Sequence, residues 1–159
     1  MKTHLLLLAL QRFVKAALER DGITAGVFMY ALPDDGKAAT FPFVLQRLVK
    51  GTTDENDNED VVALHIGVEQ SAGDDDAGTV AAGICDTLRY ALWTARILED
   101  RFQLVFPLEV RQPDPEKKEH NFHMISMITR WNYVPPDRAL GPDVYKTPYV
   151  AGRKNREEE

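Results

Sequence analysis

The sequence is poor in several residue types on which common classes of small protein depend. Its 159 residues include one cysteine and only two serines, Ser71 and Ser126. A single cysteine excludes an internal disulfide scaffold and a multi-cysteine zinc site. The net charge of −6 lacks the basic excess with which general nucleic-acid binders displace counterions from phosphates, so no specific nucleic-acid binding is expected. The 44% of hydrophobic and 28% of charged residues are typical of an ordinary globular domain.

Long hydrophobic runs are also missing. The apolar stretch Leu5 to Leu10 is followed directly by polar residues, and it is shorter than a secretory core or a membrane span. We therefore expect a protein that is made and kept in the reducing cytoplasm, without a membrane partner. The spacing of the apolar residues instead predicts an amphipathic first helix, whose buried face would hold Leu6, Ala9, Leu10, Phe13, Val14 and Ala17.

The middle of the chain alternates between strand and helix patterns. Apolar periodicity predicts a long helix over 79–100 with one broad core stripe. Alternation and β-branched residues predict four strands and a weaker fifth, at 41–50, 61–69, 103–111, 121–134 and 26–32. The expected fold is α+β, with a mainly antiparallel four- to five-stranded sheet packed by two helices. Residues 1–134 would form this single domain, and the proline-rich residues 135–159 an extended C-terminal tail.

One face of the predicted second helix lacks the charges expected of a surface. Tyr90, Trp93 and Ile97 lie opposite the core stripe at about 100° per residue. Two aromatic residues and an isoleucine there indicate a second buried contact, and we interpret these three residues as a subunit interface. The alternative is that the tail or the last strand of the same chain covers them.

Positive charge is absent from 51 to 88, a stretch that holds ten acidic residues. A pair of solvated loops would explain this concentration of acidic residues. A more specific hypothesis is that they form an acidic rim or channel in an assembly, where like charge would repel DNA. The acidic residues are concentrated in two runs, 54–60 and 74–76, and weak binding of a divalent cation is a further alternative for the second run. The residues concerned are Asp54, Glu55, Asp57, Asp74, Asp75 and Asp76.

The sequence offers few residues that could come together in a catalytic site. The acidic runs do not match the spacing of a calcium loop, and no phosphate-binding, dinucleotide or nucleophile-elbow motif occurs. His120 and His123 would point to opposite faces of a strand, which does not suit a shared zinc ion. We expect His65 to lie at the surface, and neither serine has a recognisable catalytic partner. Cys85 lies in the helix stripe as inert packing. We expect no enzyme activity, no metal and no cofactor.

The order of elements and a few segments resemble the tail-terminator, or tail-completion, proteins of long-tailed bacteriophages and prophages. The likeness covers roughly residues 3–134. The segments that carry it are the strand from Phe41-Pro42-Phe43 through Arg47 to Gly51, the strand end Ile66-Gly67-Val68, the helix end Arg96-Ile97-Leu98 and the stretch Phe106-Pro107-Leu108-Glu109-Val110. The chain departs from the family at Val110, where the family has tryptophan.

This resemblance implies a structural protein of virion assembly. Such proteins form a ring, typically hexameric, that caps the finished tail tube and joins it to the head connector, so that DNA passes through. The implied partners are further copies of the chain, the tail-tube protein and the head–tail connector protein, and the implied location is the virion tail, assembled in the host cytoplasm. The alternatives are a head-side connector, stopper or tail-tube subunit, a small metal-dependent hydrolase using His65 and the acidic turns, and a monomeric adaptor that binds peptides along a strand edge.

Overall fold

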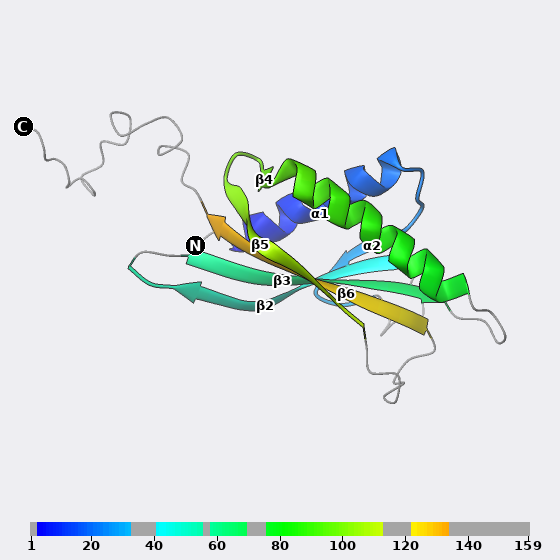
Figure 1. The fold of residues 1–159 in the computed structure, drawn as a ribbon. Coiled ribbons are helices and arrows are strands. Elements are labelled where there is room, and N and C mark those ends of the chain that lie inside the picture. Colours follow the sequence, from blue (N-terminus) through cyan, green and yellow to red (C-terminus); the bar gives the residue numbers. More distant parts are fainter. Residues whose placement is uncertain (1–2, 33–40, 56–57, 70–75, 113–121, 134–159) are drawn as a thin grey trace, which may run out of the picture.

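The computed structural model describes residues 3–32, 41–55, 58–69, 76–112 and 122–133 (Figure 1). Two helices and six strands follow one another in this part of the chain. Their order is α1 (Thr3–Arg20), β1 (Gly26–Met29), β2 (Phe43–Thr53), β3 (Asn58–Glu69), α2 (Asp76–Ala95), β4 (Ile97–Leu98), β5 (Phe102–Arg111) and β6 (Phe122–Tyr133). The tail predicted over 135–159 lies outside the described residues.

The strands form one sheet in the order β1-β2-β3-β6-β5-β4. β1 runs parallel to β2, and the other neighbouring pairs are antiparallel. The predicted α+β class and the mainly antiparallel sheet are therefore confirmed. The sheet has one strand more than the four to five expected, because periodicity assigns the two residues of β4 to the preceding helix.

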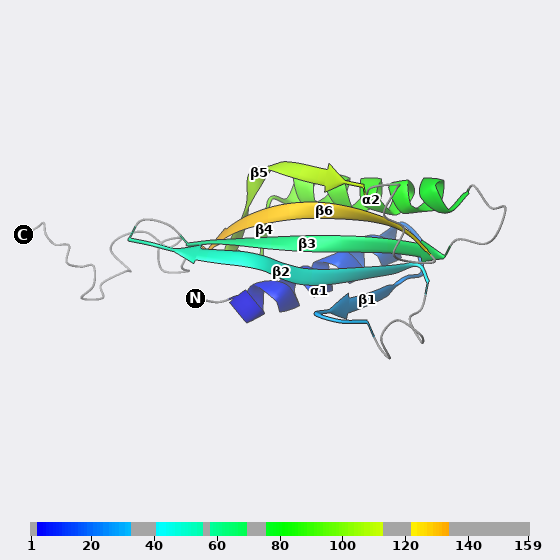
Figure 2. The same cartoon turned by 90° about the horizontal axis from the view of Figure 1, so that it is seen from below.

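Both helices cover the same face of the curled sheet, and the core lies between the two layers (Figures 1 and 2). The burial of α1 and α2 follows their apolar stripes, as the sequence predicts, because a helix lying on a sheet loses its apolar face from water. The buried helix residues are Leu6, Leu7, Ala9, Leu10, Val14, Ala17 and Leu18 in α1, and Ala77, Ala81, Ile84, Cys85, Leu88, Ala91 and Leu92 in α2.

Two buried polar side chains of this core, Gln46 and Thr129, donate hydrogen bonds to backbone carbonyls. Gln46 of β2 donates from Nε2 to the carbonyl of Leu7 at 2.5 Å, which joins the sheet to α1. Thr129 donates to the carbonyl of Val62 at 2.8 Å and accepts a hydrogen bond from Nε1 of the buried Trp131 at 2.7 Å. Such bonds offset the cost of removing polar atoms from water and fix the register of β3 against β6.

The second helix ends earlier than its periodicity predicts. Ala95 is its last residue, and Arg96 adopts a left-handed backbone conformation with φ 63°. Glu99 and Asp100 also have positive φ, so the segment turns sharply through β4 into β5. The prediction of one helix over 79–100 is therefore wrong at its C-terminal end, and Ile97 belongs to β4.

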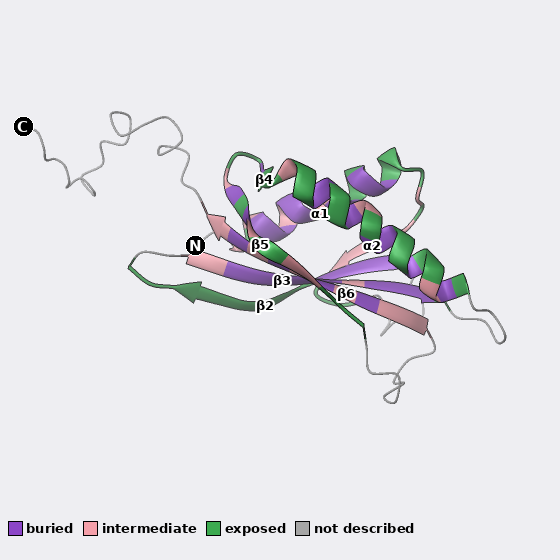
Figure 3. Ribbon diagram, in the orientation of Figure 1, coloured by how far each residue is buried: buried purple, intermediate pink, exposed green. Residues whose placement is uncertain are grey.

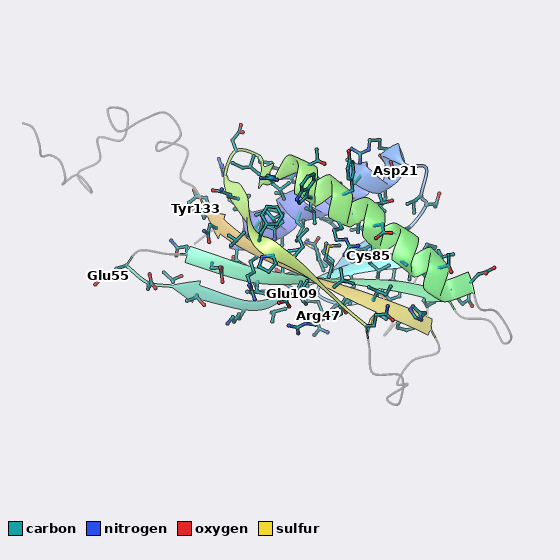
Figure 4. All side chains as sticks on the ribbon, in the orientation of Figure 1. Asp21, Arg47, Glu55, Cys85, Glu109 and Tyr133 are labelled. Atoms are coloured by element: carbon teal, nitrogen blue, oxygen red, sulfur yellow. The ribbon has the colours of Figure 1, made fainter. Side chains whose placement is uncertain are left out.

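The strands β2 and β3 continue beyond the cover of the helices. The first four residues of β2 are buried, whereas every residue from Arg47 to Thr53 is exposed (Figure 3). β1 pairs only with Phe43 to Gln46, so the outer edge of 47–53 has no strand beside it among the described residues. We call residues 47–55 and 58–59 the hairpin arm. Glu55 marks its outer end (Figure 4).

Candidate functional site

An exposed apolar groove lies between α2 and β5. Tyr90 and Trp93 stand one helical turn apart and are 66% and 52% exposed, and Phe106 of β5 is 41% exposed. The groove has a volume of about 570 Å³ and is lined by Asp86, Arg89, Tyr90, Trp93, Phe106, Pro107 and Leu108. We call it the aromatic groove. Large exposed apolar side chains gathered at one place on a surface mark a site of contact with another molecule.

The β5 wall of the aromatic groove results from an interruption of the sheet. The pairing of β5 with β6 shifts between Val105 and Glu109, so Phe106, Pro107 and Leu108 have no partner in β6. Pro107 lacks the N–H that a regular ladder would use. The bulge turns an apolar stretch of β5 out of the sheet and toward α2.

Arg96 joins the two walls. Its guanidinium carbon lies 5.2 Å from the ring centroids of both Trp93 and Phe106, a cation–π contact on each side. Its Nε donates to the carbonyl of Trp93 at 3.0 Å, and its own carbonyl accepts from the N–H of Leu104 at 2.7 Å. The left-handed turn at Arg96 thus places a cation between two aromatic rings. Arg96 has no carboxylate partner among the residues that the structure describes.

The structure brings together two of the three predicted interface residues. Tyr90 and Trp93 both line the aromatic groove. Ile97 is 42% exposed, but it pairs with Gln103 in the sheet and does not line the groove. Phe106, Leu108 and Arg96 take part in the site without having been predicted. The alternation in 103–111 places Phe106 and Leu108 with the core. Leu108 does pack partly buried against the core, whereas Phe106 is exposed where the register shifts at Pro107.

The predicted acidic rim is described only in part. Asp54 and Glu55 are exposed at the outer end of the hairpin arm, and Asp76 is the first residue of α2, where a carboxylate is favoured by the helix dipole. The remaining members, Asp57, Asp74 and Asp75, lie outside the described residues. Within the described part of the chain, no group of three histidine, cysteine or acidic side chains is arranged to hold a metal ion.

A second hollow, of about 430 Å³, opens on the face of the sheet that the helices leave bare. His65 lies there with Nδ1 hydrogen-bonded to Ser126 Oγ at 2.7 Å, so the expectation of a serine without a partner is wrong for Ser126. Burial, and then the nearby Arg47, lower the pKa of His65 from its ordinary value, which keeps the imidazole neutral near pH 7. In the described chain no carboxylate pairs with His65, so the third member of a nucleophilic triad is missing.

Cys85 lies between α2 and the sheet (Figure 4). Burial raises the pKa of its thiol, with a smaller opposing effect from Arg89. A buried thiol with a raised pKa is a poor nucleophile, and the prediction of a packing role agrees with this environment. No helix among the described residues is long and apolar enough to cross a membrane.

Among known proteins, comparison finds similarity at the level of the fold alone. No family model matches the sequence, and no curated protein matches it. One solved structure aligns with a TM-score of 0.51 at 13% identity, and the alignment covers 85% of this chain and 97% of that chain. Another, titled as the virion of a native gene transfer agent particle, aligns with a TM-score of 0.44 at 16% identity and covers 78% of this chain and 93% of that chain. The first likeness concerns the fold alone, and the second is weaker and carries no functional argument.

Proposed function

We propose that this chain is a structural protein of virion assembly, a phage tail terminator that forms a ring, caps the tail tube and joins it to the head connector. The observation that carries the ring is the aromatic groove. Its exposed Tyr90 and Trp93, and Arg96, which lies between Trp93 and Phe106, are residue types that dominate the energy of protein interfaces. A second copy of the chain would remove these side chains from water.

The sheet offers a second reason to expect copies of the chain side by side. Its order leaves the outer edge of β2 unpaired from Arg47 to Thr53 and that of β5 unpaired beyond its short contact with β4, within the described residues. Exposed strand edges pair readily with other chains unless they are protected. Because the two edges lie on different sides of one protomer, contacts between them are head-to-tail, and head-to-tail contacts close into rings when the rotation permits.

Among ring-forming proteins, we propose a tail terminator because residues 41–51 and 106–110 resemble segments of that family. The proposal includes no enzyme activity and no cofactor. The enzymatic alternative is a metal-dependent hydrolase, and within the described residues no group of three histidine, cysteine or acidic side chains could hold its metal ion. Asp54 and Glu55 are exposed at the end of the hairpin arm, and in a ring they would contribute to an acidic rim that repels DNA.

Light scattering and tube assembly test this function in two steps. The mass of the purified chain in solution should correspond to a closed oligomer near six subunits, and electron microscopy should show rings. Added to its cognate tail-tube protein, the chain should arrest tube growth and be found at one end. A chain that stays monomeric at all concentrations contradicts the ring, and one that lengthens tubes contradicts the terminator in favour of a tube subunit.

A further inference from the structure

We infer that the aromatic groove of one copy receives the hairpin arm of the next copy. This inference rests on the proposed ring and names the two surfaces that meet in it. The groove and the arm are separate parts of one protomer (Figures 1 and 4). A contact between them is therefore head-to-tail, and it leaves one free groove and one free arm at the ends of any open chain of copies.

The arm carries apolar surface that the protomer itself leaves in water. Val49 is 56% exposed and Leu48 is 39% exposed. Val49 is the residue skipped where the register of β2 against β3 shifts between Leu48 and Lys50. A bulge of this kind re-aims a side chain, and it presents Val49 at the open edge of the sheet. The groove, with Tyr90, Trp93, Phe106 and Leu108, offers apolar walls for such a side chain.

Charge favours the same pairing. Arg96 lies between the rings of Trp93 and Phe106 and has no carboxylate partner among the described residues. The outer end of the arm is acidic, with Asp54 and Glu55 exposed and no lysine or arginine from 51 to 88. An acidic tip approaching a cation that is held between aromatic rings gives complementary potentials across the contact, which sets its orientation. Groove-to-groove contact would instead place Arg96 of one copy near Arg96 of the other.

Backbone groups support the docking of a strand. The outer edge of 47–53 has no neighbouring strand in the described chain, and the outer edge of β5 is open beyond its pairing with Ile97 and Leu98. An extended segment laid along the open edge of β5 would pair main-chain groups on both sides, while its side chains fill the adjacent groove. The hairpin arm is extended already, so little ordering entropy opposes this step.

Mixing two non-assembling variants tests the inference. The arm variant carries Val49→Asp and Glu55→Lys, and the groove variant carries Tyr90→Ala and Trp93→Ala; all four residues are exposed. Each variant alone should have the monomer mass of 17.9 kDa. A mixture should form a complex of one arm variant and one groove variant and nothing larger, because only the groove of the first and the arm of the second are intact. Circular dichroism and thermal unfolding establish that both variants are folded, and Glu55→Lys alone replaces an arm variant that is not.

The matched control is Val80→Asp, which places the same charge on an exposed valine of α2 outside the groove. It should assemble like the unaltered chain. An arm variant that still forms the full ring overturns the inference and leaves the ring intact. A mixture that stays monomeric also overturns it. If the groove and the arm form one contact, the intact groove of the arm variant must bind the intact arm of the groove variant. An unaltered chain that is monomeric at every concentration overturns both the inference and the ring.

Discussion

Replacing Trp93 with alanine should separate assembly from folding. Trp93 is 52% exposed in the protomer. A buried aromatic side chain contributes 150–250 Å², so roughly 80–130 Å² of Trp93 remain for a neighbouring copy to cover. At about 25 cal/mol per Å² this area is worth roughly 2–3 kcal/mol at each subunit contact. The association constant of one contact should therefore fall about 30- to 150-fold, and the loss recurs at every contact of a ring.

The protomer should lose less than the assembly does. Trp93→Ala also removes the buried half of the side chain and its contact with Arg96, but alanine favours the helix, and the unfolded chain buries part of the indole already. We expect the free energy of unfolding to fall by about 1–2 kcal/mol, which a domain with the usual ~5–15 kcal/mol tolerates. Tyr90→Ala, at a residue that is 66% exposed, should weaken assembly with an even smaller effect on unfolding.

Trp131 provides the matched comparison, because it is 1% exposed and lies in the core. Trp131→Ala should cost about 3–5 kcal/mol of unfolding free energy. Urea unfolding of the three variants, together with their mass by light scattering across concentration, measures both effects. If Trp93→Ala keeps the unaltered mass and loses as much unfolding free energy as Trp131→Ala, the side chain belongs to the core and the interface hypothesis is wrong.

Three further predictions concern the sheet and the core. Gly67→Ala should lower the free energy of unfolding by about 1–3 kcal/mol in urea titrations, because a methyl group there overlaps the buried ring of Phe43. The centroid of that ring lies 5.4 Å from those of both Phe41 and Phe122, so an unchanged midpoint would mean that the ring moves freely. The lowered pKa of His65 keeps its imidazole neutral in the folded state, so the unfolded chain binds more protons as the pH falls below the ordinary pKa of 6.5. The free energy of unfolding should therefore be full above that pH and decline below it. His65→Gln should flatten this decline in unfolding curves between pH 7.5 and 5, and equal slopes for the two chains would contradict the prediction. Cys85 should react with a thiol reagent only as fast as the protein opens, since its thiol is buried and its pKa raised; rapid labelling of the folded chain would place it at the surface.

Periodicity was sufficient to predict the elements of this fold but not its turns. The apolar stripes of both helices and the four main strands follow from one-dimensional patterns, because burial on one face imposes them directly. The end of α2 does not follow, since the left-handed residues there are Arg96, Glu99 and Asp100, and sequence signals for that conformation are glycine and asparagine. Ile97 was placed on the wrong element for this reason.

The aromatic residues that α2 contributes to the candidate site, Tyr90 and Trp93, could be predicted from the sequence, because a helical wheel separates the two faces of α2. The other half depends on tertiary structure. Phe106 fits the core alternation of its strand and is exposed only by the register shift around Pro107. His65 and Ser126 lie 61 positions apart in the sequence, and they meet because β3 pairs with β6. Sequence patterns report local periodicity, and they contain no register between distant strands.

The arrangement of the two surfaces bears on how such a chain avoids uncontrolled growth. A head-to-tail contact that does not close produces filaments, and a protomer with an open strand edge and an apolar groove is exposed to that outcome. The acidic end of the hairpin arm opposes a different unwanted contact, the edge-to-edge pairing of two arms, because arms that approach one another repel, whereas an arm that approaches Arg96 is attracted. Glu55→Gln should therefore slow ring formation more than it weakens the finished ring, and should do so mainly at low salt, where charge steering is strongest. Stopped-flow light scattering at low and high salt measures the two effects, and a rate that is independent of both salt and Glu55 would remove the acidic tip from the assembly contact.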